Sequence, residues 1–176
     1  MQRVPEPEEL MDDGEQAAAY AEADFADANN RFVELLEAMA PRQLAGRLLD
    51  LGCGEGQVMA TVDGTVVGCD ISMELLQLVD APVVRTELPE LLWLKDDVVD
   101  TAFMVLVLEH LPNLEIMSQV ARIVRPGGGL IVVMNHPAFT AEGAGPILDP
   151  SDGEVLWRWG DYFTAAAARM ATAHAD

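Results

Sequence analysis

Three glycines within five residues follow a short apolar run, in the stretch LLDLGCGEGQ at residues 48–57. Gly52, Gly54 and Gly56 have no Cβ, so the backbone can adopt positive φ angles and approach a ligand closely. A helix that begins after such a turn offers free N–H groups and a partial positive charge to a phosphate or a carboxylate. The turn therefore predicts a ligand site, which includes Cys53 between the first two glycines.

Two carboxylates flank this turn. Asp70 ends a second apolar run, TVVGCD, where it can accept hydrogen bonds from both hydroxyls of a ribose. Asp50 precedes the turn, and its charge disfavours a pyrophosphate but suits an ammonium group. The dinucleotide fingerprint G-x-G-x-x-G needs a third glycine at position 57, which is Gln57 here. A nicotinamide-dependent dehydrogenase is therefore disfavoured, although Asp70 suits either ligand.

The composition excludes several classes of partner. With 30 acidic and 10 basic residues, the net charge of −20 disfavours nucleic acid and anionic membranes, and a cationic or neutral small molecule is more compatible.

No apolar run reaches the roughly 18 residues of a membrane span, and the acidic N-terminus has no signal core. Cys53 and Cys69 lie in or beside apolar runs, which favours reduced thiols and a cytoplasmic location. No Cys or His spacing predicts a metal site.

Helical patterns alternate with apolar runs along the chain. The helical patterns are residues 17–39, 57–62, 73–79 (capped by Ser72) and 114–124. The apolar runs predict strands at residues 47–51, 65–69, 82–85, 100–107 and 130–134. Because these strands have no polar face, we expect an α/β fold with a doubly wound, mostly parallel sheet. Such a sheet binds ligands beyond the carboxyl ends of its strands.

Four stretches, over about residues 45–137, resemble the class I S-adenosylmethionine-dependent methyltransferases in their small-molecule, type 11-like branch. They are LLDLGCGEG, VVGCDIS, VDTAFMVLVLEHLPN and VARIVRPGGGLIVV. The resemblance implies a Rossmann-like sheet, S-adenosylmethionine as the cofactor, and methyl transfer to a small-molecule acceptor. Because a sulfonium methyl is already activated, the protein has mainly to align the acceptor and exclude water.

The resemblance also implies roles for single residues. It places the three glycines under the methionine part of the cofactor, Asp50 near its ammonium and Asp70 on the ribose. Ile71 would pack on the adenine, and Met104 and Val105 would lie near the methionine and sulfonium end. The N-terminal helix is similar to the family's lid. This likeness would place Tyr20, Phe25 or Asn29 over the cofactor.

Two histidines are candidates for a general base, which is needed only where the acceptor must lose a proton. His110, in LEHLP, and His136, in NHPAF, follow the fourth and fifth predicted strands. For each, a structural or pocket-lining role is the more common alternative. Glu109 could bond the acceptor or be a solvated loop acid. The aromatic stretch at residues 157–163 is predicted as a loop that lines the acceptor pocket, packs in a core or contacts a subunit.

The chain departs from the family pattern in three respects. The first helix and the link from the second to the third strand are short. At the end of the third strand the family often has an acid and a small residue against the adenine, where this chain has Thr86 and Glu87. After Phe163 no apolar alternation remains for the family's last two strands. We therefore expect five strands, a shortened C-terminus and an exposed edge at the fifth strand, which a second copy or a partner subunit would cover.

These observations predict an acidic disordered tail (1–16), a methyltransferase domain with its lid helix (17–163), and a helical or disordered tail (164–176). The leading interpretation is an S-adenosylmethionine-dependent methyltransferase that acts on a small molecule. The alternative is a catalytically impaired homologue that binds the cofactor or stabilises a partner. The expected lack of two strands favours the alternative, whereas the intact glycine turn with Asp70 disfavours it.

Overall fold

The computed structural model describes residues 11, 13–21, 26–39, 44, 46–62, 64–139, 141 and 143–161. It divides into two compact units, Met1–Val133 and Met134–Asp176, named here the sheet unit and the hairpin unit. Within the described residues, no helix is both long enough and apolar enough to cross a membrane.

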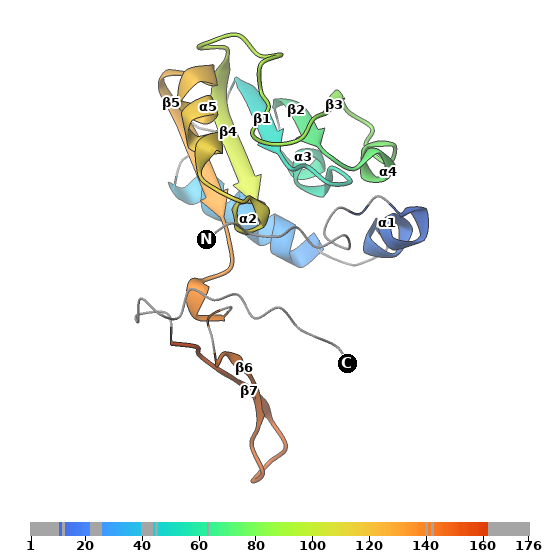
Figure 1. Ribbon diagram of the computed structural model, residues 1–176, viewed down its shortest axis with the longest axis vertical. Helices are drawn as coiled ribbons and strands as arrows, with labels where there is room; N and C mark the ends of the chain where they lie inside the picture. Colours follow the sequence, from blue (N-terminus) through green and yellow to red (C-terminus); the bar gives the residue numbers. More distant parts are fainter. Residues whose placement is uncertain are drawn as a thin grey trace. The chain divides into compact units, whose positions relative to one another are not determined.

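The sheet unit is built on five parallel strands in the order β3-β2-β1-β4-β5 (Figure 1). The strands are β1 (Arg47–Leu51), β2 (Thr65–Asp70), β3 (Val83–Arg85), β4 (Val99–Val105) and β5 (Val124–Val133). The order reverses between β1 and β4, and an open α/β sheet binds ligands at such a switch point. The predicted fold class, a doubly wound parallel sheet of five strands, is confirmed.

Helices cover both faces of this sheet (Figure 1). They are α1 (Gly14–Ala21), α2 (Ala26–Met39), α3 (Gln57–Thr61), α4 (Met73–Leu76), α5 (Glu115–Ile123) and the 3-10 turn η3 (Leu108–His110). On one face, α5 packs on a core that includes Leu49, Leu51, Cys69 and Met104. On the other face, side chains of α2, α3 and α4 pack on Leu48, Val66 and Phe103. Leu48 and Leu49 lie in opposite cores because successive strand side chains point to opposite faces.

Several predicted boundaries differ from the observed ones. The helix predicted over 17–39 is two helices, α1 and α2, and residues 22–25 between them lie outside the described part. The expected acidic tail lies mostly outside it too, although α1 begins at Gly14. β5 begins at Val124 instead of residue 130, because the Arg-Pro-Gly-Gly-Gly run continues the pairing with β4 through a register shift between Val99 and Thr101.

The hairpin unit contains a strand pair that the sequence analysis missed. β6 (Gly145–Leu148) pairs antiparallel with β7 (Val155–Arg158), and the 3-10 turn η4 (Pro137–Phe139) precedes them. The loop predicted from residue 157 is therefore wrong for Trp157 and Arg158, which belong to β7. A turn closes the hairpin, in which the Ser151 N–H and hydroxyl both donate to Asp149. The end of the aromatic stretch and the predicted C-terminal tail lie outside the described residues.

One carboxylate ties three strands together at the amino end of the sheet. Asp100 on β4 accepts hydrogen bonds at Oδ2 from the backbone N–H of Arg47 (2.6 Å) and from its Nε (3.3 Å). Its Oδ1 pairs with Arg125 Nε on β5 at 2.6 Å. These partners, the Arg47 backbone N–H first, hold the pKa of Asp100 below its ordinary value.

One arginine anchors the loop between β3 and β4 to α5. The guanidinium of Arg122 donates to the carbonyls of Leu91 and Leu94, each at 2.8 Å, and pairs with Asp96 at 2.9 Å. Leu91 is fully buried in the core. The Leu91 carbonyl also accepts the N–H of Leu94 at 3.0 Å. Arg122 therefore adds charge-assisted hydrogen bonds that fasten this loop, which has no secondary structure of its own, to α5.

We expect Arg122→Ala to lower the free energy of unfolding by about 2–4 kcal/mol, because it removes charge-assisted hydrogen bonds to partly buried carbonyls. The matched control is Arg31→Ala, which removes an exposed ion pair with Glu34 and should cost about 0.5 kcal/mol or less. Urea unfolding of the two variants checks this, and equal losses would contradict the anchoring role of Arg122.

Candidate functional site

The glycine turn after β1 is fixed by hydrogen bonds to the end of β2. The N–H groups of Gly52 and Cys53 both donate to the carbonyl of Cys69, at 2.7 and 3.0 Å. The glycines have φ angles of +78°, +53° and +80°, as the sequence predicted for a turn that needs glycine. A Cβ on Gly52 would overlap the side chain of Val107, and a Cβ on Gly56 would come within 2.9 Å of Val79.

Asp70 connects the turn to the next helix. Its Oδ2 accepts the N–H of Gly54 at 2.9 Å, and its Oδ1 accepts the N–H of Ser72 at 2.9 Å. Each carboxylate oxygen has a second lone-pair direction, so Asp70 can still accept hydrogen bonds from a ligand. The predicted pairing of this acid with the glycine turn is thus a direct contact.

Asp50 is the most unusual ionisable group of this edge. Only 2% of the residue is exposed. Burial, and secondly the charge of Asp70, raise the pKa of Asp50 to about 8. A cation placed beside Asp50 would favour its ionised form, so the site is suited to an ammonium group.

The two cysteines are structural rather than reactive. Cys53 and Cys69 are free and buried, and they pack in the opposite cores of the sheet. Burial raises the pKa of the Cys53 thiol above its ordinary value and that of Cys69 to about 12. Neither thiol is therefore a ready nucleophile, because the thiolate is the reactive form.

The residues predicted at the adenine lie next to Asp70. The N–H of Thr86 donates to the Asp70 carbonyl at 2.9 Å, and its hydroxyl donates to the carbonyl of Glu90 at 2.7 Å. The carbonyl of Ile71 accepts from Arg85 Nε at 2.8 Å, and Glu87 is exposed. The structure thus brings this group to the same edge as the turn, and its contact with adenine stays a prediction.

Met104 and Val105 are the last two residues of β4, and the Met104 side chain is fully buried in the core. Their place near the methionine and sulfonium end of the cofactor stays a prediction. The residue that reaches the glycine turn is Val107, whose side chain lies beside Gly52. No sequence signal singled out Val107, because its contact depends on how the chain turns after the strand.

The two candidate bases lie in different units. His110 is exposed at the end of η3, and its N–H donates to the carbonyl of Val107 at 2.9 Å. It therefore belongs to the loop that touches the glycine turn. His136 belongs to the hairpin unit, where its Nδ1 accepts from the N–H of Ala138 at 3.2 Å and its ring lies 6.1 Å from that of Trp159. The catalytic role of each stays a prediction.

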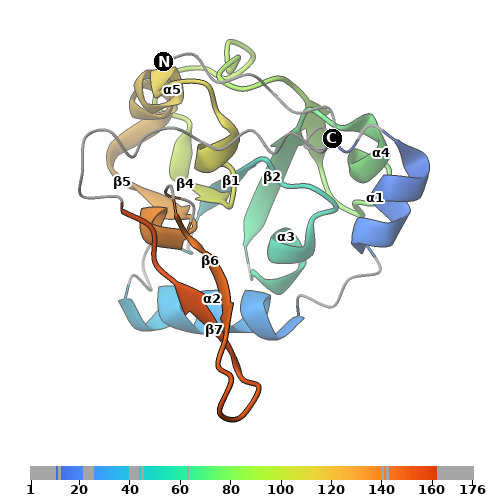
Figure 2. The same ribbon diagram turned by 60° about the horizontal axis from the view of Figure 1, so that its bottom comes forward.

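Of the three predicted lid residues, only Asn29 has a described side chain. Its Nδ2 donates to the side-chain oxygen of Gln57 at 2.9 Å, which joins α2 to the start of α3. Figure 2 shows α2 near α3 and α1 beside α4. The side chain of Tyr20 and the whole of Phe25 lie outside the described residues.

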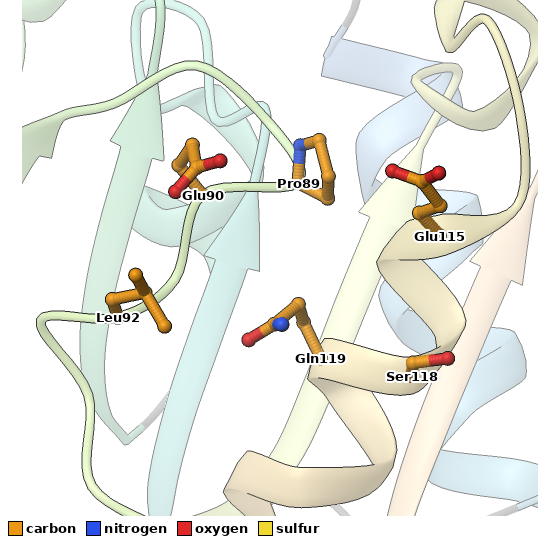
Figure 3. Close-up of a pocket in the computed structure, with 6 residues that line it drawn as sticks. All are labelled: Pro89, Glu90, Leu92, Glu115, Ser118 and Gln119. Atoms are coloured by element: carbon orange, nitrogen blue, oxygen red, sulfur yellow. The ribbon is translucent and has the colours of Figure 1, made fainter.

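A groove of about 330 Å³ lies between α5 and the loop after β3 (Figure 3). Its lining residues are Pro89, Glu90, Leu92, Glu115, Ser118 and Gln119. None of them is a predicted site residue. No group of His, Cys, Asp and Glu within the described ranges could hold a metal ion.

We expect Gly52→Ala to destabilise the protein by about 2–4 kcal/mol, because a positive φ and an overlap with Val107 act together. Gly127→Ala is the matched control, since Gly127 also has a positive φ of 82° but has open space beside it. It should cost only about 1–2 kcal/mol. Thermal and urea unfolding would measure both, and equal costs would exclude a close contact of Val107 with the turn.

Asp50 should make stability depend on pH. Its carboxyl has a pKa near 8 when folded and near 3.8 when unfolded, so the folded state holds an extra proton between these values. Its contribution to stability is therefore lost as the pH rises from about 4 to 8, at up to about 1.4 kcal/mol per pH unit. We expect Asp50→Asn to reduce this slope. Urea unfolding at pH 5.5 and 7.5 checks it, with exposed Asp80→Asn as the control that should keep the wild-type slope.

Comparison with known proteins agrees with this geometry. Residues 49–132 match the model of a family described as "Methyltransferase domain". The chain is 32% identical over 124 residues to a trans-aconitate 2-methyltransferase of Azoarcus sp., covering 62% of this chain and 47% of the relative. It is 28% identical over 123 residues to a 27-O-demethylrifamycin SV methyltransferase of Amycolatopsis mediterranei, covering 61% and 45%. The chain thus spans about half the length of these curated relatives.

Solved structures show the same fold. One, described as an S-adenosyl-L-methionine-dependent methyltransferase of Methanococcus maripaludis, superposes with a TM-score of 0.61 at 15% identity, covering 74% of this chain and 66% of that one. The glycine turn, Asp50, Asp70 and four of the five strands lie wholly or almost wholly within the matched stretch, residues 49–132. Residues 49–132, just under half of the chain, are thus similar to a methyltransferase domain.

Proposed function

We propose that this protein transfers the methyl group of S-adenosylmethionine to a small-molecule acceptor. The observation that carries the proposal is the pair of acids at the switch point of the sheet. Asp50 is buried and has a raised pKa, and Asp70 accepts a hydrogen bond from the glycine turn. A ligand that carries an ammonium group and a ribose satisfies both acids at once, and S-adenosylmethionine has both groups.

The residues of the edge fit this cofactor. The glycine turn leaves room for the methionine part, Asp50 would bind its ammonium, and Asp70 would accept the ribose hydroxyls. When bound, the cofactor supplies a methyl group that its sulfonium already activates. Binding of the ammonium would also lower the pKa of Asp50, because a cation favours the ionised carboxylate.

The acceptor side of the proposal rests on the loop after β4. Val107 lies against Gly52 and His110 ends η3, so this loop borders the predicted methionine site. His110 would take the proton of an acceptor that must lose one, and His136 is the second candidate. Where the acceptor needs no base, alignment and exclusion of water suffice.

The net charge of the protein limits the charge that its acceptor is expected to carry. The net charge of −20 favours a neutral or cationic acceptor, whereas the trans-aconitate of one relative is a tricarboxylate. We therefore expect trans-aconitate to be a poor acceptor here. We also propose a cytoplasmic location, which the two free cysteines support. We further propose that a second copy or a partner subunit covers the edge of β5, because β5 stands at the end of the strand order.

The proposal is tested by calorimetric titration with S-adenosylmethionine. We expect micromolar binding that Asp70→Ala weakens at least tenfold, about 1.4 kcal/mol, because the ribose loses its acceptor. Asp80→Ala, at an exposed acid, is the control and should bind like the wild type. Binding followed by failure to methylate a panel of phenols, amines and carboxylates would favour the impaired homologue. No binding by the wild type would exclude the methyltransferase proposal and would leave the homologue that stabilises a partner.

A further inference from the structure

Ser72 is a buried polar residue that the proposed chemistry does not use. None of it is exposed, and it lies two residues after Asp70. Its N–H donates to Asp70 Oδ1 at 2.9 Å, and its Oγ accepts the N–H of Leu75 at 3.2 Å, which caps α4 as the sequence predicted. Its hydroxyl proton is donated to the carbonyl of Met11 at 2.7 Å. Ser72 is therefore bonded to three parts of the chain.

The bond to Met11 joins segments far apart in the sequence. Met11 precedes Ser72 by 61 residues, whereas the other two partners are local. Met11 also has a φ of +51°, a backbone conformation that residues with a side chain rarely adopt. Such a conformation persists only where surrounding contacts fix it, and the hydrogen bond from Ser72 is such a contact.

The chain that follows Met11 packs against α4. Figures 1 and 2 both show α1 beside α4, and the two helices are in contact. Ala17 of α1 is only 2% exposed, whereas Ala18 and Ala19 of the same helix are exposed. Ala17 is therefore buried, whereas its two neighbours Ala18 and Ala19 face solvent. We name residues 11 and 13–21 the N-terminal segment.

We propose that Ser72 is a positioning residue that links docking of the N-terminal segment to ligand binding at Asp70. The hydrogen bonds run without a break from Gly54 through Asp70 and Ser72 to Met11. Ligand binding at Asp70 and docking of the N-terminal segment both depend on the position of Ser72. Each therefore increases the affinity of the other by the same factor. The inference rests on the proposed function only for the identity of the ligand, S-adenosylmethionine.

The first test displaces the segment in the full chain. Ala17→Glu puts a charge at a buried position of α1, and Ala18→Glu makes the same change at an exposed position. We expect Ala17→Glu to weaken S-adenosylmethionine binding on the order of tenfold, and Ala18→Glu to leave it within about twofold. Equal affinities of Ala17→Glu and the wild type, measured by calorimetry, would overturn the link.

The second test asks whether Ser72 acts through the segment. Ser72→Ala removes the hydroxyl, and Ser72→Thr keeps both the cap and the donor. We expect weaker binding in Ser72→Ala, recovery in Ser72→Thr, and no further loss when Ser72→Ala is added to Ala17→Glu. Additive losses in the double variant would mean that Ser72 acts on Asp70 alone and would overturn the proposal. Thermal unfolding of each variant separates loss of the helix cap from loss of binding.

Hydrogen exchange separates this inference from the proposed function. Without ligand, Ser72→Ala should speed amide exchange in residues 14–21 compared with Ser72→Thr, which tests the Met11 contact even if S-adenosylmethionine does not bind. With ligand, exchange of residues 14–21 should slow in the wild type and not in Ser72→Ala. Unchanged exchange in Ser72→Ala without ligand would show that Ser72 does not hold the segment.

Discussion

The carboxyl edge of the sheet depends on the hydrogen bonds of one carboxylate. Asp70 accepts the N–H of Gly54 from the turn after β1 and the N–H of Ser72 at the start of α4. Those two donors belong to neighbouring strand–helix connections, so the same acid fixes the shape of both. The glycines make this possible, because all three have positive φ angles that residues with a side chain rarely adopt. The candidate ligand site is the surface that these bonds create.

The burial of Asp50 supports the proposal that this edge binds a ligand. A buried carboxylate near a second one is costly to ionise, which is why its pKa is raised to about 8. A structural role would be served better by an apolar or amide side chain at this place in β1. The cost is offset only when a cation binds, so selection for function explains the residue more directly than selection for folding.

Sequence patterns predicted the sheet well because the features that form its strands are local in the sequence. Apolar runs without a polar face indicate buried parallel strands, and the turn with Asp50 and Asp70 follows from residue types at fixed spacing. Sequence patterns did not predict side-chain contacts between segments that are far apart in the chain. Val107 at Gly52 and Ser72 at Met11 depend on how distant segments meet. The β6–β7 hairpin was missed because its strands are only four residues long, too short for a clear alternation.

The Asp100 cluster has a consequence for how this molecule can change over evolutionary time. Its bonds to Arg47 and Arg125 tie β1, β4 and β5 at the amino end, away from the ligand edge. The strand order is thus secured at the edge opposite the proposed ligand site. Loops at the opposite end can therefore diverge in length and composition while the sheet persists, so new acceptors can be recruited without inventing a new fold.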